Sequence, residues 1–107
     1  MRLSDRDKLA RELKALADPM RLRILSLLPH EPVCDDVYNV SELAGELGIT
    51  QPSVSHHLLL LKAAGLVKSR KMCRDVYYWI DAGAMSKVLH RTARLLDLSS
   101  SPLAPNP

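Results

Sequence analysis

The segment 39–65 contains two short helical patterns separated by a glycine, and this arrangement constrains the fold more than any other feature. Ser41 is expected to cap the first helix, after which apolar residues recur on one helical face: Leu43, Ala44 and Leu47. Gly48 follows at once, where a helix end often requires a positive φ. Two helices joined by a glycine-containing turn form a helix-turn-helix, in which the second helix enters a DNA major groove.

The second helix of this arrangement has a polar outer face in its N-terminal half. Thr50 is expected to cap it, Pro52 is tolerated in its first turn, and its inner stripe is apolar: Val54, Leu58 and Leu61. The outer side chains suit base edges and phosphates, and we predict that they contact DNA: Gln51, Ser53, Ser55, His56 and His57. His57 ranks last, because its ring could turn inward. The simpler alternative is a solvated polar helix.

Two predicted strands follow the second helix, which Gly65 is expected to close. They cover residues 66–70 and 76–80, and residues 71–75 form the predicted hairpin tip between them. The hairpin is basic, and we predict contacts to phosphate or the minor groove from Arg70, Lys71 and Arg74. A helix-turn-helix followed by such a hairpin is a winged helix. A further short strand at residues 37–40 could precede it.

Three other helices are predicted from caps and apolar periodicity. Ser4 is expected to cap an amphipathic first helix, Asp18 and Pro19 to begin a more apolar second one, and Asp81 to cap the last. The apolar faces of the first and last helices are expected to form a dimer interface, because a domain this small has few internal surfaces to cover them: Leu9, Leu13 and Leu16, then Met85, Val88, Leu89, Leu95 and Leu96. We therefore predict a mainly α, dimeric domain over residues 1–98, followed by a disordered Ser/Pro tail at 99–107.

Charge and length agree with a small DNA-binding protein. The 107 residues fit one domain, and the formal net charge is +3. No Lys or Arg occurs between Pro29 and Leu61, whereas basic residues cluster on either side, which is a weak electrostatic footprint for a polyanion. No apolar run is long enough for a membrane span, and the N-terminus lacks a signal-peptide pattern. We expect a cytoplasmic, reduced protein, because two cysteines make no disulfide framework.

Several segments together closely resemble the ArsR-type (ArsR/SmtB) family of bacterial winged-helix repressors. The segments that carry the resemblance are Ala15-Leu16-Ala17-Asp18-Pro19-Met20-Arg21-Leu22-Arg23-Ile24-Leu25, Val40-Ser41-Glu42-Leu43-Ala44, Gln51-Pro52-Ser53-Val54-Ser55-His56-His57-Leu58, Ala64-Gly65-Leu66-Val67 and Val76-Tyr77-Tyr78-Trp79-Ile80-Asp81. The resemblance implies a homodimer built on the first and last helices. It also implies operator binding that a metal ion, a metalloid or a redox signal relieves.

The metal-ligand positions that the resemblance implies are not filled by ligands here. Asn39 and Ser41 stand where a thiolate site of the family has cysteines. The positions of a zinc-type site on the last helix are Ala82, Ala84, Leu95 and Leu98. A short gap could bring in Asp81 or His90 without restoring four ligands. We therefore expect no tight zinc site on the last helix.

Cys34 and Cys73 are the candidate sensor residues that remain. They could be two unrelated thiols, or they could form a thiol switch or a soft-metal site, with His30 as a further ligand. The functional alternative requires the hairpin tip to approach the loop that carries Cys34. No cofactor can be named from these residues.

The sequence thus predicts a sequence-specific DNA-binding regulator, a homodimeric repressor on a palindromic operator. One alternative is a winged helix that contacts only proteins. Another is an enzyme with Cys34 or Cys73 as nucleophile. The sequence argues against an enzyme, because it shows no Gly-rich phosphate loop and no recognisable catalytic motif. We expect no enzymatic activity.

Overall fold

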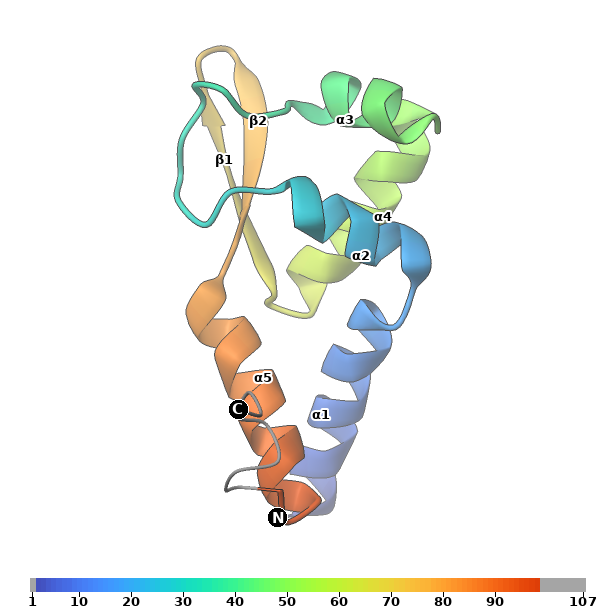
Figure 1. The fold of residues 1–107 in the computed structure, drawn as a ribbon, viewed down its shortest axis with the longest axis vertical. Coiled ribbons are helices and arrows are strands. Elements are labelled where there is room, and N and C mark those ends of the chain that lie inside the picture. The colour runs from blue at the N-terminus through green and yellow to red at the C-terminus, as the bar shows by residue number, and fades with distance from the viewer. Residues whose placement is uncertain (1, 99–107) are drawn as a thin grey trace, which may run out of the picture.

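The computed structural model describes residues 2–98, and the predicted tail at 99–107 lies outside them. The chain forms five helices and one antiparallel hairpin (Figure 1): α1 Leu3–Leu16, α2 Pro19–Leu27, α3 Val40–Leu47, α4 Gln51–Ala63, β1 Val67–Met72, β2 Asp75–Ile80 and α5 Ala82–Leu95. The predicted mainly α architecture with a β-hairpin wing is confirmed.

Capping side chains set the starts of four helices. The side chains of Asp18, Thr50 and Asp81 accept hydrogen bonds from backbone N–H groups in the first turns of α2, α4 and α5, as predicted. The prediction for α3 was wrong, because Asn39 and not Ser41 is the cap. Asn39 Oδ1 accepts from Glu42 N at 2.8 Å, and Glu42 Oε1 accepts from Asn39 N at 3.0 Å, which forms a capping box.

Three other boundaries differ from those predicted. Ser4 lies inside α1, which begins at Leu3 with Arg2 at its cap position. Residues 37–39 form no strand, because the backbone enters the α3 cap there. The hairpin strands extend further than predicted, so its tip is only the pair Cys73 and Arg74.

The hydrophobic core lies where α4 crosses the other helices and the base of the hairpin. Six side chains in it have no exposed surface: Ile24, Val54, Leu58, Leu61, Leu66 and Val88. Burying a side chain of this size stabilises the folded state by about 1.5–3 kcal/mol. Gly48 ends α3 with a φ of +69°, as predicted, and this left-handed turn directs α4 across α3. Helix α2 is only partly buried although its sequence is apolar, since Leu22 is exposed.

The two-residue tip of the hairpin has an unusual backbone. Met72 pairs with Asp75, and the two residues between them, Cys73 and Arg74, have φ values of +51° and +74°. Two-residue hairpins with both central residues at positive φ favour Asn-Gly. A residue with a side chain in this region costs of order 1 kcal/mol or more, so contacts elsewhere must hold the turn.

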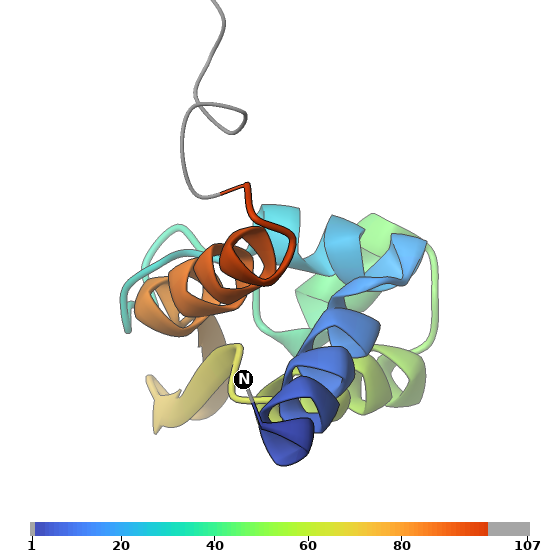
Figure 2. The same cartoon turned by 90° about the horizontal axis from the view of Figure 1, so that it is seen from below.

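Helices α1 and α5 extend together from the body of the molecule, away from the hairpin tip and the α3–α4 turn (Figures 1 and 2). Arg91 of α5 donates from Nη2 to the buried carboxylate of Glu12 in α1 at 3.0 Å, which joins the two helices. Leu9 of α1 and Val88 of α5 are buried within the single chain, so neither is free for a partner as predicted. No helix within residues 2–98 is long and apolar enough to cross a membrane.

Candidate nucleic-acid interface

Helix α4 separates an apolar inner face from a polar outer face. Val54 and Leu58 point into the core with no exposed surface, whereas Ser55 and His56, next to Val54 in the chain, are exposed. The Thr50 cap and Pro52 in the first turn start the helix immediately before this polar row. The structure therefore leaves Ser55 and His56 free to contact an external ligand.

The other three predicted α4 residues are partly engaged within the protein. Gln51 is exposed, and its Nε2 donates to Ser41 Oγ at 3.1 Å, which connects the starts of α3 and α4. Ser53 and His57 are half-buried. His57 Nδ1 lies 3.3 Å from Nη1 of Arg21, so its ring does turn toward the protein.

Arg21 is a structural residue that the sequence reasoning did not identify. Its Nε donates to the carbonyl of Ala15 at 2.6 Å, near the end of α1. Its backbone N–H donates to the Asp18 carboxylate, which lowers the pKa of Asp18. Together with the His57 contact, these bonds fix the α1–α2 turn against α4. The Asp18-Pro19 helix start is a sequence signal for the turn that Arg21 supports. No local pattern, however, indicates that Arg21 contacts His57.

The cations of the hairpin do not share one face. Arg70 pairs with Tyr77 and Lys71 with Val76, so their side chains alternate across the hairpin. The Arg70 guanidinium lies 5.7 Å from the ring centroid of Trp79, a cation–π contact that places it over the hairpin base. Lys71 and Arg74 are exposed. The hairpin thus presents positive charge on both faces and at its tip.

Two lysines of the basic cluster that follows Leu61 lie at the base of the hairpin and were not predicted as site residues. Lys62 Nζ donates to Ser69 Oγ at 2.7 Å, joining the end of α4 to β1. Lys68 Nζ lies 3.6 Å from the Asp81 carboxylate at the start of α5. The pKa of Asp81 is lowered, first by the hydrogen bond from Ala84 N and then by the Lys68 charge. These contacts orient the hairpin relative to α4 and α5.

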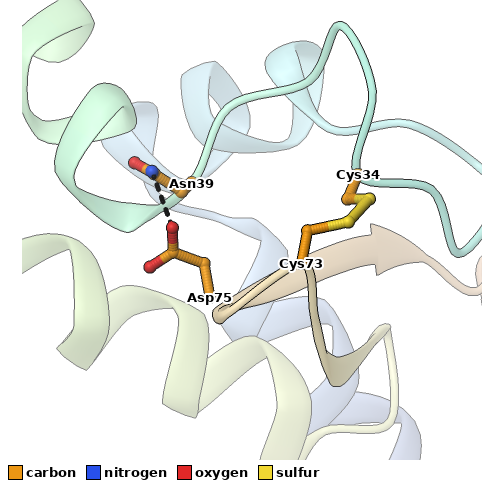
Figure 3. Close-up of a disulfide and its surroundings, with 4 residues drawn as sticks. All are labelled: Cys34, Asn39, Cys73 and Asp75. Atoms are coloured by element: carbon orange, nitrogen blue, oxygen red, sulfur yellow. Dashed lines mark hydrogen bonds between the residues drawn. A yellow bond between two sulfur atoms is a disulfide. The ribbon is translucent and has the colours of Figure 1, made fainter.

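Cys34 and Cys73 form a disulfide between the α2–α3 loop and the hairpin tip, with their Cα atoms 6.6 Å apart (Figure 3). The alternative of two unrelated thiols is therefore wrong, and so is the expectation that both are reduced. The hairpin tip approaches the loop, as the functional alternative required. Beside the disulfide, Asn39 Nδ2 donates to Asp75 Oδ2 at 3.3 Å. His30 is exposed in the same loop.

The positions at which the family's metal sites would occur do not fit a metal ion. Asn39 is occupied as the α3 cap and as a donor to Asp75, and the side chains at 82, 84, 95 and 98 have no ligating atom. Within residues 2–98, no three His, Cys, Asp or Glu side chains are grouped so that they could hold a metal ion. The predicted DNA-contacting surface of α4 and the hairpin thus offers hydrogen-bonding and cationic side chains rather than a set of metal ligands.

Sequence comparison places this arrangement in a known family. Residues 18–69 match the model of the bacterial regulatory protein, arsR family. A transcriptional repressor SmtB homologue of Synechocystis is 38% identical over 78 residues, which are 73% of this chain and 55% of that protein, so the chain matches about half of that relative's length. The transcriptional activator HlyU of Vibrio cholerae is 38% identical over 82 residues, which are 74% of this chain and 71% of that protein.

Solved structures agree with the sequence comparison. An ArsR-like regulator from Rhodococcus superposes with a TM-score of 0.76 at 28% identity, over 91% of this chain and 84% of that one. A homodimeric winged helix-turn-helix DNA-binding domain from Mycobacterium bovis superposes with a TM-score of 0.64 at 29% identity, over 88% of this chain and 82% of that one. Both the fold and the resemblance predicted from sequence are confirmed. The chain belongs to the ArsR family of winged helix-turn-helix transcriptional regulators.

Proposed function

We propose that the protein is a homodimeric repressor that binds a palindromic operator through α4 and the hairpin. The observation that carries the proposal is the division of α4, with Val54 and Leu58 fully buried and Ser55 and His56 exposed beside them. Exposed hydroxyl and imidazole groups at the N-terminal half of such a helix suit base edges in the major groove. Such a protein acts on chromosomal DNA in the cytoplasm and needs no catalytic group.

The proposed contacts fall into two groups. Ser55 and His56 read bases, while Gln51 and Ser53 position the start of α4 on the DNA. The wing contacts come from Arg70, Lys71 and Arg74. Because Arg70 and Lys71 lie on opposite faces, a hairpin entering a minor groove would direct one cation to each phosphate backbone. His57 contributes indirectly, since Arg21 holds its ring.

Exposed leucines on α5 support dimerisation through that helix. Leu89 and Leu96, seven residues apart and therefore on one face, are 59% and 60% exposed, and Leu95 beside them is 45% exposed. Half-buried Leu13 and Leu16 of α1 adjoin this surface through the α1–α5 contact. A domain of this size gains stability by covering such leucines with a second copy.

The proposal is tested by selecting duplexes from a random-sequence pool with the reduced protein and measuring affinity for the selected and scrambled sequences. We expect an imperfect palindrome with half-sites about one helical turn apart. Ser55→Ala should change base preference, whereas Ser86→Ala, an exposed serine on α5, should not. Binding without any sequence preference, or no binding at all, would favour the protein-interaction alternative.

A further inference from the structure

The α2–α3 loop is attached to the hairpin at three points along its length. At its start, Ile80 N of β2 donates to the carbonyl of Pro29 at 2.9 Å. At its end, Asn39 Nδ2 donates to Asp75 at 3.3 Å. Between them, the Cys34–Cys73 disulfide holds the middle of the loop against the tip (Figure 3). Only the middle attachment can be opened and closed by redox chemistry.

The disulfide is accessible to small reagents. Cys73 is exposed and Cys34 is half-buried. Cys73 precedes Arg74 and lies two residues after Lys71, and nearby cations favour the thiolate that reacts with oxidants. A regulator that acts on cytoplasmic DNA works where thiols are kept reduced, and disulfides there are transient or redox-sensing. These features suit a reversible bond rather than a permanent one.

Closing the disulfide brings negative charge to the basic tip. Asp35 and Asp36 directly follow Cys34, and both are exposed. Within residues 2–98, neither carboxylate forms an ion pair with a cationic side chain. Asp35 contributes, after burial and Asp75 and Glu42, to raising the pKa of Tyr77 in β2, so its charge acts on the hairpin. Because the disulfide joins Cys34 to Cys73, it keeps the segment that carries these carboxylates at the hairpin tip, where they would repel DNA phosphates.

We propose that Cys34 and Cys73 form a redox modification site that weakens DNA binding when it is oxidised. The inference rests on the proposed function. Hydrogen peroxide is the oxidant: the Cys73 thiolate attacks one oxygen, the O–O bond breaks and the thiolate becomes a sulfenic acid, while the released hydroxide takes up a proton and forms water. The Cys34 thiolate then attacks that sulfur and forms the S–S bond, and the departing hydroxide leaves as a second water. A dithiol reverses the reaction and is itself oxidised to a disulfide.

The effect of the Cys34–Cys73 disulfide on DNA binding follows from its position between the α2–α3 loop and the hairpin tip. Opening it frees the middle of the loop, so Asp35 and Asp36 can move away from the tip. It also removes one restraint on the turn at Cys73 and Arg74, whose positive φ values require support from neighbouring contacts. The wing cations can then approach phosphate, with no coupling to a distant site required.

The test compares the affinity of dithiol-reduced and peroxide-oxidised protein for a duplex selected by the reduced form, with the thiol state verified by labelling. Oxidation should weaken binding about tenfold at low salt, and less at high salt. The Cys34→Ser/Cys73→Ser variant should keep the reduced affinity under both conditions. Equal affinity of reduced and verified-oxidised wild type would overturn the proposal.

A second variant separates the charge effect from a change of wing geometry. Asp35→Asn/Asp36→Asn retains both cysteines and should still form the disulfide, but its oxidised form should bind almost as tightly as its reduced form. A full loss of affinity on oxidation of this variant would refute the role of the carboxylates. Failure of the reduced wild type to select any duplex would refute the proposed function itself.

Discussion

The helix-turn-helix and the hairpin form one surface, but they are held in different ways. Val54, Leu58 and Leu61 fix α4 by complete burial, and side-chain caps fix the starts of α3 and α4. Much of the hairpin is exposed, and its outer part is held by attachments: the disulfide and the bond from Asn39 to Asp75. Burial cannot be altered without unfolding the domain, whereas an attachment can be released. We therefore propose that the fixed helix α4 reads the DNA sequence and that the attached hairpin can be adjusted.

The largest expected effect comes from a substitution in the buried face of α4. Leu58→Ala should lower the free energy of unfolding by about 2–5 kcal/mol, because it removes a fully buried side chain and leaves a cavity. Leu59→Ala is the matched control, since Leu59 is 62% exposed and its loss should change stability by no more than about 0.5 kcal/mol. Chemical denaturation of both variants measures the difference. Similar losses for the two would contradict the burial assigned to α4.

The next effect concerns the dimer that brings two such surfaces together. Leu89→Glu should convert a micromolar dimer into monomers, because a charge would have to be buried in an apolar interface. Lys87→Glu alters the charge of an exposed residue on the opposite side of α5 and should leave the dimer intact. Sedimentation velocity separates the two outcomes. A wild type that sediments as a monomer would refute the interface.

The smallest effect concerns the cap that joins the hairpin to α5. Asp81→Ala should destabilise the protein by about 1 kcal/mol at neutral pH, because the Ala84 N–H loses its acceptor. The pKa of Asp81 is lowered from its ordinary value of 3.8, so its charge contributes fully above that value. The contribution is lost as pH falls through the folded-state pKa.

Asp81→Asn provides the control for the pH dependence, because asparagine caps a helix without a charge. The difference in melting temperature between wild type and Asp81→Asn should shrink below pH 3.8. A difference that stays constant down to pH 2 would show that the Asp81 charge does not stabilise the fold.

Local patterns predicted most of the fold. The caps at Asp18, Thr50 and Asp81 and the turn at Gly48 follow from short-range hydrogen bonding and backbone preference, which the sequence displays directly. The correct cap of α3 could also have been predicted from the sequence, since Asn39 and Glu42 have capping-box spacing.

Long-range pairings could not be predicted from local pattern. Cys34 and Cys73 are 39 residues apart, and Arg21 and His57 are 36 apart, and both pairs depend on how complete elements pack. Leu9 was assigned to the dimer interface for the same reason, because an apolar stripe does not reveal whether its own chain or a partner covers it. The burial of Leu9 shows that α1 uses part of that stripe internally.

The most direct test of the two-part surface measures how affinity depends on salt and on sequence for one variant from each part. Arg74→Ala should weaken binding to selected and scrambled duplexes alike, and it should reduce the slope of log affinity against log salt by about one unit. Arg6→Ala, which removes an exposed cation close to the start of α1, should leave both quantities unchanged. His56→Ala should instead lose affinity mainly for the selected duplex, at an unchanged slope. Equal losses on both duplexes for His56→Ala and Arg74→Ala would contradict the division between α4 and the hairpin.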